Sequence, residues 1–237
     1  MIGEIDMVLK GNGEAIGLLN QLSERQMPEH PEDVLLAFED FELLMMRYES
    51  AIREVQTKLE ILNAELSLIR DDSPISSIHS RLKKPASIYG KLIRQDNEIS
   101  VRSIEENLND VAGIRVICAF IDDIYKVARM LVRQDDITLI EVKDYIKSPK
   151  PNGYRSFHII LEVPVFFAEE KKPIRVEVQI RTVAMDFWAS LEHQIRYKKG
   201  LPKKKADEIA ADLKGCADTI AETDRRMLAI KENLSSK

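Results

Sequence analysis

The spacing of hydrophobic residues changes along the chain and divides it into three regions. In residues 31–69, apolar side chains recur at intervals of three and four, as at Val34, Phe38 and Phe41. This spacing predicts one long amphipathic helix that ends near Pro74. Its apolar face could cover the chain's own sheet or pack on another subunit, and the pattern leaves both open.

In the central region, apolar runs of strand length alternate with short helical patterns, which predicts a mixed sheet. The expected strands are residues 75–82, 111–120, 137–146, 154–167 and 174–182, and the expected helices are residues 85–94 and 123–133. A polar turn over residues 168–173 favours a hairpin between the last two strands. Helical spacing returns from Thr182 to His193, and a charged helix follows Pro202. The predicted fold class is α+β, with helices flanking the sheet.

Composition limits the classes of protein to which the chain can belong. Its 237 residues are 44% hydrophobic, which is enough for one generous packed core. The net charge is −5 although 32% of the residues are charged, so a phosphate site requires a local cluster of cations. Cys118 and Cys216 lie far apart and are expected to be reduced thiols. Because there is no secretory signal and no apolar run of about 18 residues, a cytoplasmic location is expected.

The first local cluster of cations lies where a helix is expected to begin, at Pro85. Its polar members are Arg81, Lys83, Lys84, Ser87, Lys91 and Arg94. A helix N-terminus offers free amide groups and the positive end of a dipole, so this segment could bind a triphosphate. An ordinary solvated basic turn explains the same residues about equally well on their own.

Two carboxylates adjoin predicted strands. Asp110 precedes the strand of residues 111–120, in which Arg115 requires an anionic partner or a position at the rim. The polar side of a later strand carries Arg175, Glu177, Gln179 and Arg181. Turn chemistry explains Asp110 alone, and a solvated sheet face explains Glu177 alone. Phosphoryl transfer needs Mg²⁺ held by one or two carboxylates, and Asp110 and Glu177 are the candidate pair.

A basic loop rich in proline and glycine leads into another predicted strand. Lys143 and Lys150 belong to the loop region, and Tyr154, Ser156 and His158 are expected to share one face of the strand. A tyrosine beside lysines suits a purine that stacks on the ring while its phosphates meet the lysines. A plain surface strand is the alternative, but a loop position favours binding.

The last motif is a helix over residues 185–198, in which Phe187, Trp188, Leu191 and Ile195 are expected to be partly buried. Other catalytic signatures are missing from the sequence. It has four histidines and contains no HExxH, Walker A, GxSxG or Cys/His metal spacing. Zinc chemistry and triad hydrolysis are therefore not expected.

In this order, the motifs resemble the synthetase domain of RelA/SpoT-type proteins, and specifically the stand-alone small alarmone synthetases. GYRSFH at residues 153–158 and EVQIRT at residues 177–182 are nearly intact. The resemblance implies a nucleotidyltransferase-like fold and transfer of the β,γ-pyrophosphate of ATP to the 3′-hydroxyl of GDP or GTP. The products would be AMP and guanosine tetra- or pentaphosphate, a stringent-response alarmone. The enzyme would be a GTP diphosphokinase with Mg²⁺ as its cofactor.

The resemblance also implies roles for individual residues. ATP would contact Arg81, Lys83, Ser87, Lys91 and Arg115. The guanine nucleotide would contact Lys143, Lys150, Tyr154, His158, Gln179 and Asp186. Asp110 and Glu177 would bind Mg²⁺, and Glu177 would either draw the proton from the 3′-hydroxyl or orient that hydroxyl. Lys143 stands where arginine can occur and Asp186 where asparagine can, which puts their contacts in question.

The expected division of the chain is an arm and long helix in residues 1–72, a catalytic domain in residues 73–200 and a C-terminal helix in residues 201–237. No hydrolase domain is expected, because the segment before Ser73 offers only His30. The resemblance implies a homotetramer, assembled through the terminal helices, and an alarmone or RNA as further candidate ligands. The alternative function is a catalytically silent regulator that binds nucleotide or RNA, against which the presence of both carboxylates argues.

Overall fold

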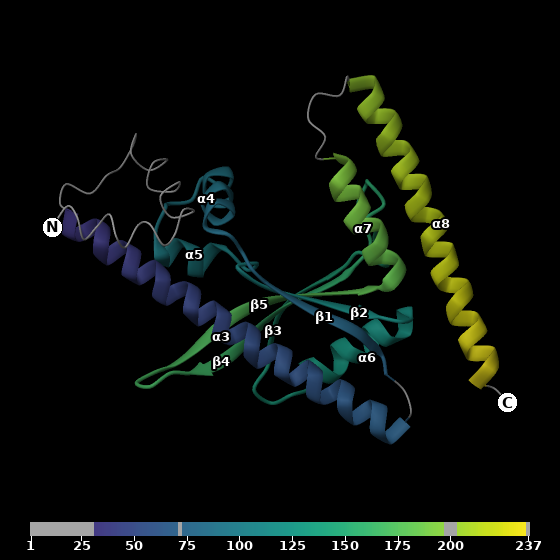
Figure 1. The fold of residues 1–237 in the computed structure, drawn as a ribbon, viewed down its shortest axis with the longest axis horizontal. Coiled ribbons are helices and arrows are strands. Elements are labelled where there is room, and N and C mark those ends of the chain that lie inside the picture. The colour runs from purple at the N-terminus through teal and green to yellow at the C-terminus, as the bar shows by residue number, and fades with distance from the viewer. Residues whose placement is uncertain (1–30, 71–72, 197–202, 236–237) are drawn as a thin grey trace.

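The computed structural model describes residues 31–70, 73–196 and 203–235, which form a five-stranded sheet and six helices (Figure 1). The strands are β1 (Ile75–Leu82), β2 (Ala112–Cys118), β3 (Thr138–Asp144), β4 (Phe157–Phe166) and β5 (Lys171–Thr182). The helices are α3 (Pro31–Arg70), α4 (Pro85–Arg94), α5 (Val101–Asn107), α6 (Ile121–Val132), α7 (Val183–Arg196) and α8 (Lys203–Ser235). The α+β class is confirmed. The predicted arm, residues 1–30, and residues 198–202 of the basic stretch before α8 lie outside the described residues.

The strands follow the order β1-β2-β5-β4-β3 across the sheet. β2 and β5 are parallel, and the other neighbouring pairs are antiparallel, so the sheet is mixed as predicted. β4 and β5 form the expected hairpin, whose turn is closed by a hydrogen bond of 2.8 Å from the Phe167 amide to the Glu170 carbonyl. This order places β5, which carries Glu177, at the centre of the sheet.

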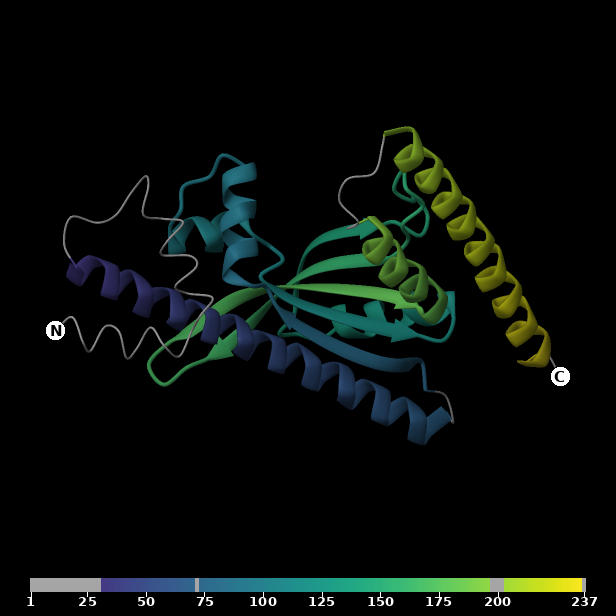
Figure 2. The ribbon, with the colours of Figure 1, turned by 45° about the horizontal axis from the view of Figure 1, so that its top comes forward.

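One face of the sheet packs against α3 and α6. Val116 of β2 and Val178 of β5 are fully buried together with Val55 and Leu59 of α3 in one apolar core. Each such side chain stabilises the fold by roughly 1.5–3 kcal/mol. Helix α3 runs across the sheet in both ribbon views (Figures 1 and 2). The long helix therefore covers the chain's own sheet, while its predicted contact with another subunit stays a prediction.

Some local features differ from the sequence prediction. β5 begins at Lys171, inside the predicted turn of residues 168–173, so the hairpin turn is shorter than expected. Hydrophobic spacing does not predict α5, because seven residues supply too few repeats, but Ser100 caps this helix with its side chain. Strand β4 begins at Phe157 and not at Tyr154. Gly153 has a φ of +90°, and the Tyr154 amide donates to Asn152 Oδ1 at 3.2 Å, so this segment is a turn.

Within the described residues, helix α7 is covered on one side only. Trp188 is 5% exposed and donates from Nε1 to the Leu213 carbonyl of α8 at 2.8 Å. The prediction of partial burial is wrong for Phe187, Leu191 and Ile195, which are exposed. Their spacing of four residues places them on one stripe of the helix, and α8 does not cover that stripe.

The structure also describes the two cysteines and the hydrophobicity of the helices. Cys118 is buried and Cys216 is exposed, and neither is in a disulfide within the described residues. Within the described residues, no helix is both long enough and apolar enough to cross a membrane.

Candidate active site

Polar side chains form aligned rows on the sheet face opposite α3. Strand pairing places five of them opposite one another across the whole sheet: His79, Arg115, Gln179, His158 and Lys143. Glu177 lies in the adjacent row, opposite Gly113 of β2. Because side chains alternate across a strand, positions two residues apart share a face. Residues from three sequence motifs therefore meet on one surface.

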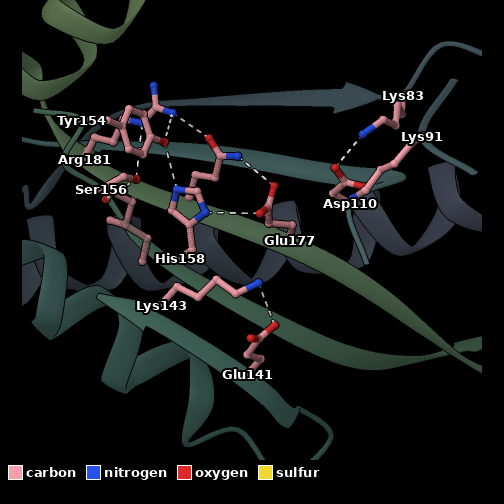
Figure 3. Close-up of polar contacts among 12 residues, drawn as sticks. Lys83, Lys91, Asp110, Glu141, Lys143, Tyr154, Ser156, His158, Glu177 and Arg181 are labelled. Carbon is pink, nitrogen blue, oxygen red and sulfur yellow. Dashed lines mark hydrogen bonds and ion pairs between the residues drawn. The ribbon is translucent and has the colours of Figure 1, made fainter. Parts of the chain in front are cut away.

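Asp110 lies between two lysines that come from different elements. Lys83, just after β1, donates to Oδ2 at 2.6 Å, and Lys91 of α4 donates to Oδ1 at 2.9 Å (Figure 3). The antiparallel pairing of β1 and β2 brings Lys83 and Asp110 together. Burial opposes ionisation, but the hydrogen bonds and charges of the two lysines outweigh it and lower the pKa of Asp110 below its ordinary 3.8. Asp110 is therefore a carboxylate at neutral pH.

Glu177 is held by two residues that are not lysines. His158 Nδ1 lies 3.2 Å from Oε1, and Gln179 Nε2 donates to Oε2 at 2.8 Å. Burial favours the neutral acid, but these hydrogen bonds outweigh it and lower the pKa of Glu177 below its ordinary 4.5. The charge of Asp110 acts in the opposite direction, so the two carboxylates interact across the sheet face.

Arg181 completes a ring of hydrogen bonds of which Glu177 is a member. Its Nη2 donates to the Tyr154 hydroxyl at 2.6 Å and to Gln179 Oε1 at 2.8 Å. The Tyr154 hydroxyl lies 2.9 Å from His158 Nε2, and His158 and Gln179 both contact Glu177. We call these five residues the Glu177 ring (Figure 3). Arg181 is 5% exposed, so the ring is fixed from within the protein.

Arg115 has the anionic partner that its place in an apolar strand requires. Its Nη1 lies 3.4 Å from Asp186 Oδ1 in the first turn of α7, and Asp186 also accepts from Arg181 at 3.0 Å. The Nε of Arg115 is buried and has no hydrogen-bond partner among the described residues. The predicted contact of Asp186 with guanine stays a prediction, because this carboxylate is engaged by two arginines.

Lys150 lies against two tyrosine rings. Its Nζ is 4.6 Å from the ring centre of Tyr145 and 4.9 Å from that of Tyr154. Such contacts between a cation and an aromatic ring contribute about 0.5–1 kcal/mol at exposed sites. A purine that stacks on Tyr154 from this side must displace Lys150. On the neighbouring strand, Lys143 pairs with Glu141 at 2.9 Å, which raises the pKa of Lys143.

Two predicted ATP contacts lie at the edge of this surface. Arg81 stands opposite Gly113 near the end of β1, and Ser87 lies in the first turn of α4; both are exposed. The first turn of α4 contains no acidic residue, and its N-cap residue makes no side-chain capping bond. The amide groups at this end of α4 are therefore suited to an anion.

The donor set fits a magnesium ion that arrives with a nucleotide. Within the described residues, no group of three or more His, Cys, Asp or Glu side chains could hold a metal. Mg²⁺, however, commonly uses one or two carboxylates and completes its shell with water and substrate phosphates. Asp110 and Glu177 supply two carboxylates, and their present partners can be exchanged only if the lysines and the ring residues move.

A separate hollow of about 200 Å³ lies between α3, α5 and the β4–β5 hairpin. Its lining includes Tyr48, Glu105, Lys172 and Arg175. Lys172 pairs with Glu105 at 2.6 Å, so part of the positive charge in the hollow is already balanced. None of the predicted site residues lines it, and the candidate chemistry lies on the sheet face instead.

Sequence reasoning identifies the members of this site better than their connections. The structure brings Asp110 together with Lys83 and Lys91, and Glu177 together with Gln179, as the motifs suggest. It also gives central positions to Arg181 and Tyr145, which are not among the predicted ligands. In the sequence, Arg181 is recognisable as the last long polar residue of a predicted strand, and Tyr145 as an aromatic residue in a basic loop.

The mixed sheet with a charged open face defines an α+β protein whose site is built on strands, and the comparisons narrow this class. The family described as the region found in RelA / SpoT proteins matches residues 80–201, slightly more than half of the chain. The chain belongs to the RelA/SpoT family. Its relative GTP pyrophosphokinase YwaC of Bacillus subtilis (strain 168) is 42% identical over 207 residues, which are 86% of this chain and 97% of the relative.

Solved structures give the same result. The small alarmone synthetase 2 from Bacillus subtilis has a TM-score of 0.72 and 40% identity, and the match covers 82% of this chain and 99% of that one. The small alarmone synthetase 1 from the same organism, bound to its product pppGpp, has a TM-score of 0.73 and 34% identity. That match covers 81% of this chain and 97% of the other. The likeness therefore extends beyond the region common to the family.

Proposed function

We propose that the chain is a GTP pyrophosphokinase that transfers the β,γ-pyrophosphate of ATP to the 3′-hydroxyl of GDP or GTP. The 3′ oxygen bonds to the β-phosphorus, the bond from that phosphorus to the α-phosphate bridging oxygen breaks, and AMP leaves. The proton of the 3′-hydroxyl is released to the solvent as the new bond forms. The observation that carries this proposal is the placement of two ionised carboxylates, Asp110 and Glu177, on one sheet face. Lys83 and Lys91 bind the first carboxylate, and the other members of the Glu177 ring hold the second.

The side around Asp110 suits the triphosphate of ATP. Lys83 and Lys91 already converge on one anion, and a triphosphate offers several more oxygen acceptors to the same ammonium groups. Arg115 offers a buried Nε that has no hydrogen-bond partner within the part of the chain that the structure describes, and the N-terminus of α4 follows Lys83 on this side. We assign ATP contacts to Arg81, Lys83, Ser87, Lys91 and Arg115.

The side around Tyr154 suits the guanine nucleotide. The Tyr154 ring provides a stacking surface once Lys150 moves, and the displaced ammonium is then near enough to meet a phosphate. Lys143 stands opposite His158 in the same row. We assign contacts with GDP or GTP to Lys143, Lys150, Tyr154, His158, Gln179 and Asp186.

Asp110 and Glu177 would hold Mg²⁺, which when bound balances the charge that develops on the transferred phosphates. Glu177 also acts on the acceptor hydroxyl, because its carboxylate is ionised and held in a fixed direction by His158 and Gln179. A low pKa makes Glu177 a weak base. We therefore give it orientation of the 3′-hydroxyl as its main role.

The state of assembly and the location are part of the proposal. Exposed apolar residues on α3, α7 and α8, such as Leu36, Phe187 and Ile230, support a homo-oligomer with the terminal helices in its interfaces. A homotetramer is the assembly that we propose. ATP and guanine nucleotides are abundant in the cytoplasm, which is where we place the reaction.

The test is to incubate the purified protein with Mg²⁺, ATP and GDP and to identify the products by chromatography. AMP and guanosine tetraphosphate in equal amounts are expected. Formation of ADP would contradict the proposal, and no reaction while both nucleotides bind would indicate the alternative, a catalytically silent nucleotide- or RNA-binding regulator. The pair of ionised carboxylates favours the enzyme, because binding alone requires neither.

A further inference from the structure

Helix α8 begins after the region that the family match covers, yet it contacts the parts of the sheet that carry the guanine side. Thr182, at the end of β5, donates to Asp224 of α8 at 2.6 Å. Trp188 of α7 donates to the Leu213 carbonyl of α8 at 2.8 Å. The ribbon views show α8 lying beside α7 at one end of the sheet (Figure 2). Helix α8 is thus a structural part of the domain.

Arg155 connects the same helix to the loop that holds Tyr154. Although it is the next residue after Tyr154, its guanidinium contacts α8, and its side chain is 16% exposed. Nη1 donates to the Ala217 carbonyl at 3.2 Å, and Nη2 donates to Asp218 Oδ1 at 3.0 Å. Nη1 also donates to the Gly153 carbonyl at 3.0 Å, so one guanidinium joins the loop backbone to the helix.

The backbone of the loop also touches α8 directly. A Cβ added at Gly153 would lie 2.7 Å from Ala217 Cβ and 3.5 Å from Lys214 Cα. Gly153 has a φ of +90°, a conformation that glycine adopts without strain. The turn before Tyr154 is therefore shaped against α8, independently of the bonds made by Arg155.

We infer that α8 positions the guanine-nucleotide side of the site, with Arg155 as the positioning residue that fixes Tyr154 through Ala217 and Asp218. This inference rests on the proposed role of Tyr154. The ATP side is held differently, because Lys83, Lys91 and Asp110 bond to one another across β1, α4 and the start of β2. Loosening the contact with α8 should therefore weaken binding of the guanine nucleotide and leave binding of ATP unaffected.

The test replaces Asp218 with Asn in the full chain and measures KM for GDP and for ATP separately. Asp218→Asn removes a charge that Arg155 and Lys214 share and keeps the shape of the side chain. We expect KM for GDP to rise about fivefold and KM for ATP to stay within about twofold. The matched control is Glu222→Gln, which removes a carboxylate whose hydrogen-bonded partners, Arg225 and Arg226, lie on α8 itself. It should leave both constants unchanged.

The only tryptophan of the chain reports whether α8 stays in place. Trp188 is buried against α8, so release of the helix would expose it to water and shift its emission to longer wavelength. The inference requires unchanged emission in Asp218→Asn together with the selective rise in KM for GDP. An unchanged KM for GDP, an equal rise for both nucleotides, or a shifted emission would overturn it.

Tyr154→Ala, measured beside it, separates this inference from the proposed function. If Tyr154→Ala raises KM for GDP selectively and Asp218→Asn does not, the guanine assignment stands and the role of α8 is wrong. If Tyr154→Ala affects ATP and GDP equally, the guanine assignment is itself wrong, and with it the inference built on it.

Discussion

Asp110 and Glu177 lie on the same sheet face, but their charges are balanced by different kinds of partner. Asp110 meets two ammonium groups on long flexible stems, Lys83 and Lys91. Glu177 meets an imidazole and an amide that the rest of the Glu177 ring holds in place. Lysines can turn from a carboxylate to a phosphate at little cost, whereas a closed ring of hydrogen bonds resists change.

This difference suggests that the two sides of the site are prepared in different ways. On the Asp110 side, the two lysines balance the charge of the ionised carboxylate until a triphosphate and its metal ion arrive. On the Glu177 side, the orientation of the carboxylate is set before any acceptor binds, which lowers the entropic cost of aligning the 3′-hydroxyl. Variants that disturb one side and spare the other test the comparison.

The largest effect is expected for Glu177→Gln. The amide keeps the shape of the side chain but has no negative charge with which to hold Mg²⁺ and orient the 3′-hydroxyl, so kcat should fall about 10³-fold. The measurement is the rate of AMP formation at saturating ATP and GDP. Glu162→Gln is the control, because Glu162 stands opposite Arg175, nearer the hairpin, and should retain full activity. A loss below tenfold in Glu177→Gln would remove Glu177 from the reaction.

Asp110→Asn should have the next largest effect, a fall in kcat of about 10²-fold with a higher requirement for Mg²⁺. The substitution removes one carboxylate ligand and leaves Lys83 and Lys91 without their anion. The Mg²⁺ requirement is measured by titrating activity with Mg²⁺ at fixed nucleotide concentrations. Asp136→Asn, at a surface pair with Lys58, is the control. If half-saturation by Mg²⁺ were the same in Asp110→Asn and the wild type, Asp110 would not be a metal ligand.

Tyr154→Ala should act mainly on binding of the guanine nucleotide. Stacking of a base on an aromatic ring contributes about 1–3 kcal/mol, so KM for GDP should rise about tenfold or more while KM for ATP changes little. Tyr154→Phe keeps the ring and removes the hydroxyl that contacts His158 and Arg181. It should therefore retain GDP binding and lose kcat. A Phe variant as weak in GDP binding as the Ala variant would place the role of Tyr154 in the hydroxyl.

The periodic elements were the most predictable part of the molecule. The predicted helix of residues 31–69 differs from α3 by one residue, because its repeat extends over many turns. Helix α5 escapes prediction because it is short, and the turn at Gly153 shortens β4 because glycine permits a positive φ that hydrophobic spacing does not register. Such features depend on single residues and not on periodicity.

The composition of the site was predictable, but its connections were not. Strand alternation places Glu177, Gln179 and Arg181 on one face, and the structure agrees. Alternation does not reveal that Arg181 reaches the Tyr154 hydroxyl, because their contact depends on the pairing of β4 with β5 and on the turn before β4. The contact of Arg155 with α8 joins residues 63 positions apart and has no local signal.

The smallest effect concerns stability, and it distinguishes Asp110 from another buried carboxyl. The pKa of Asp110 is lowered in the folded state, so the unfolded chain binds more protons near its ordinary value of 3.8. Its contribution to stability is present above that value and is lost as the pH falls through the lower folded value. The advantage of the wild type over Asp110→Asn in urea unfolding should therefore shrink by about 1 kcal/mol between pH 6 and pH 3.

Asp224 should behave in the opposite way. Burial raises its pKa above 3.8, although Thr182 donates a hydrogen bond to it. A raised value favours the protonated form in the folded state, so its contribution is present below pH 3.8 and is lost as the pH rises through the folded value. Asp224→Asn should therefore become more stable relative to the wild type as the pH rises from 3 to 6. If both variants moved in the same direction, the difference between a carboxylate paired with lysines and one that is merely buried would not hold.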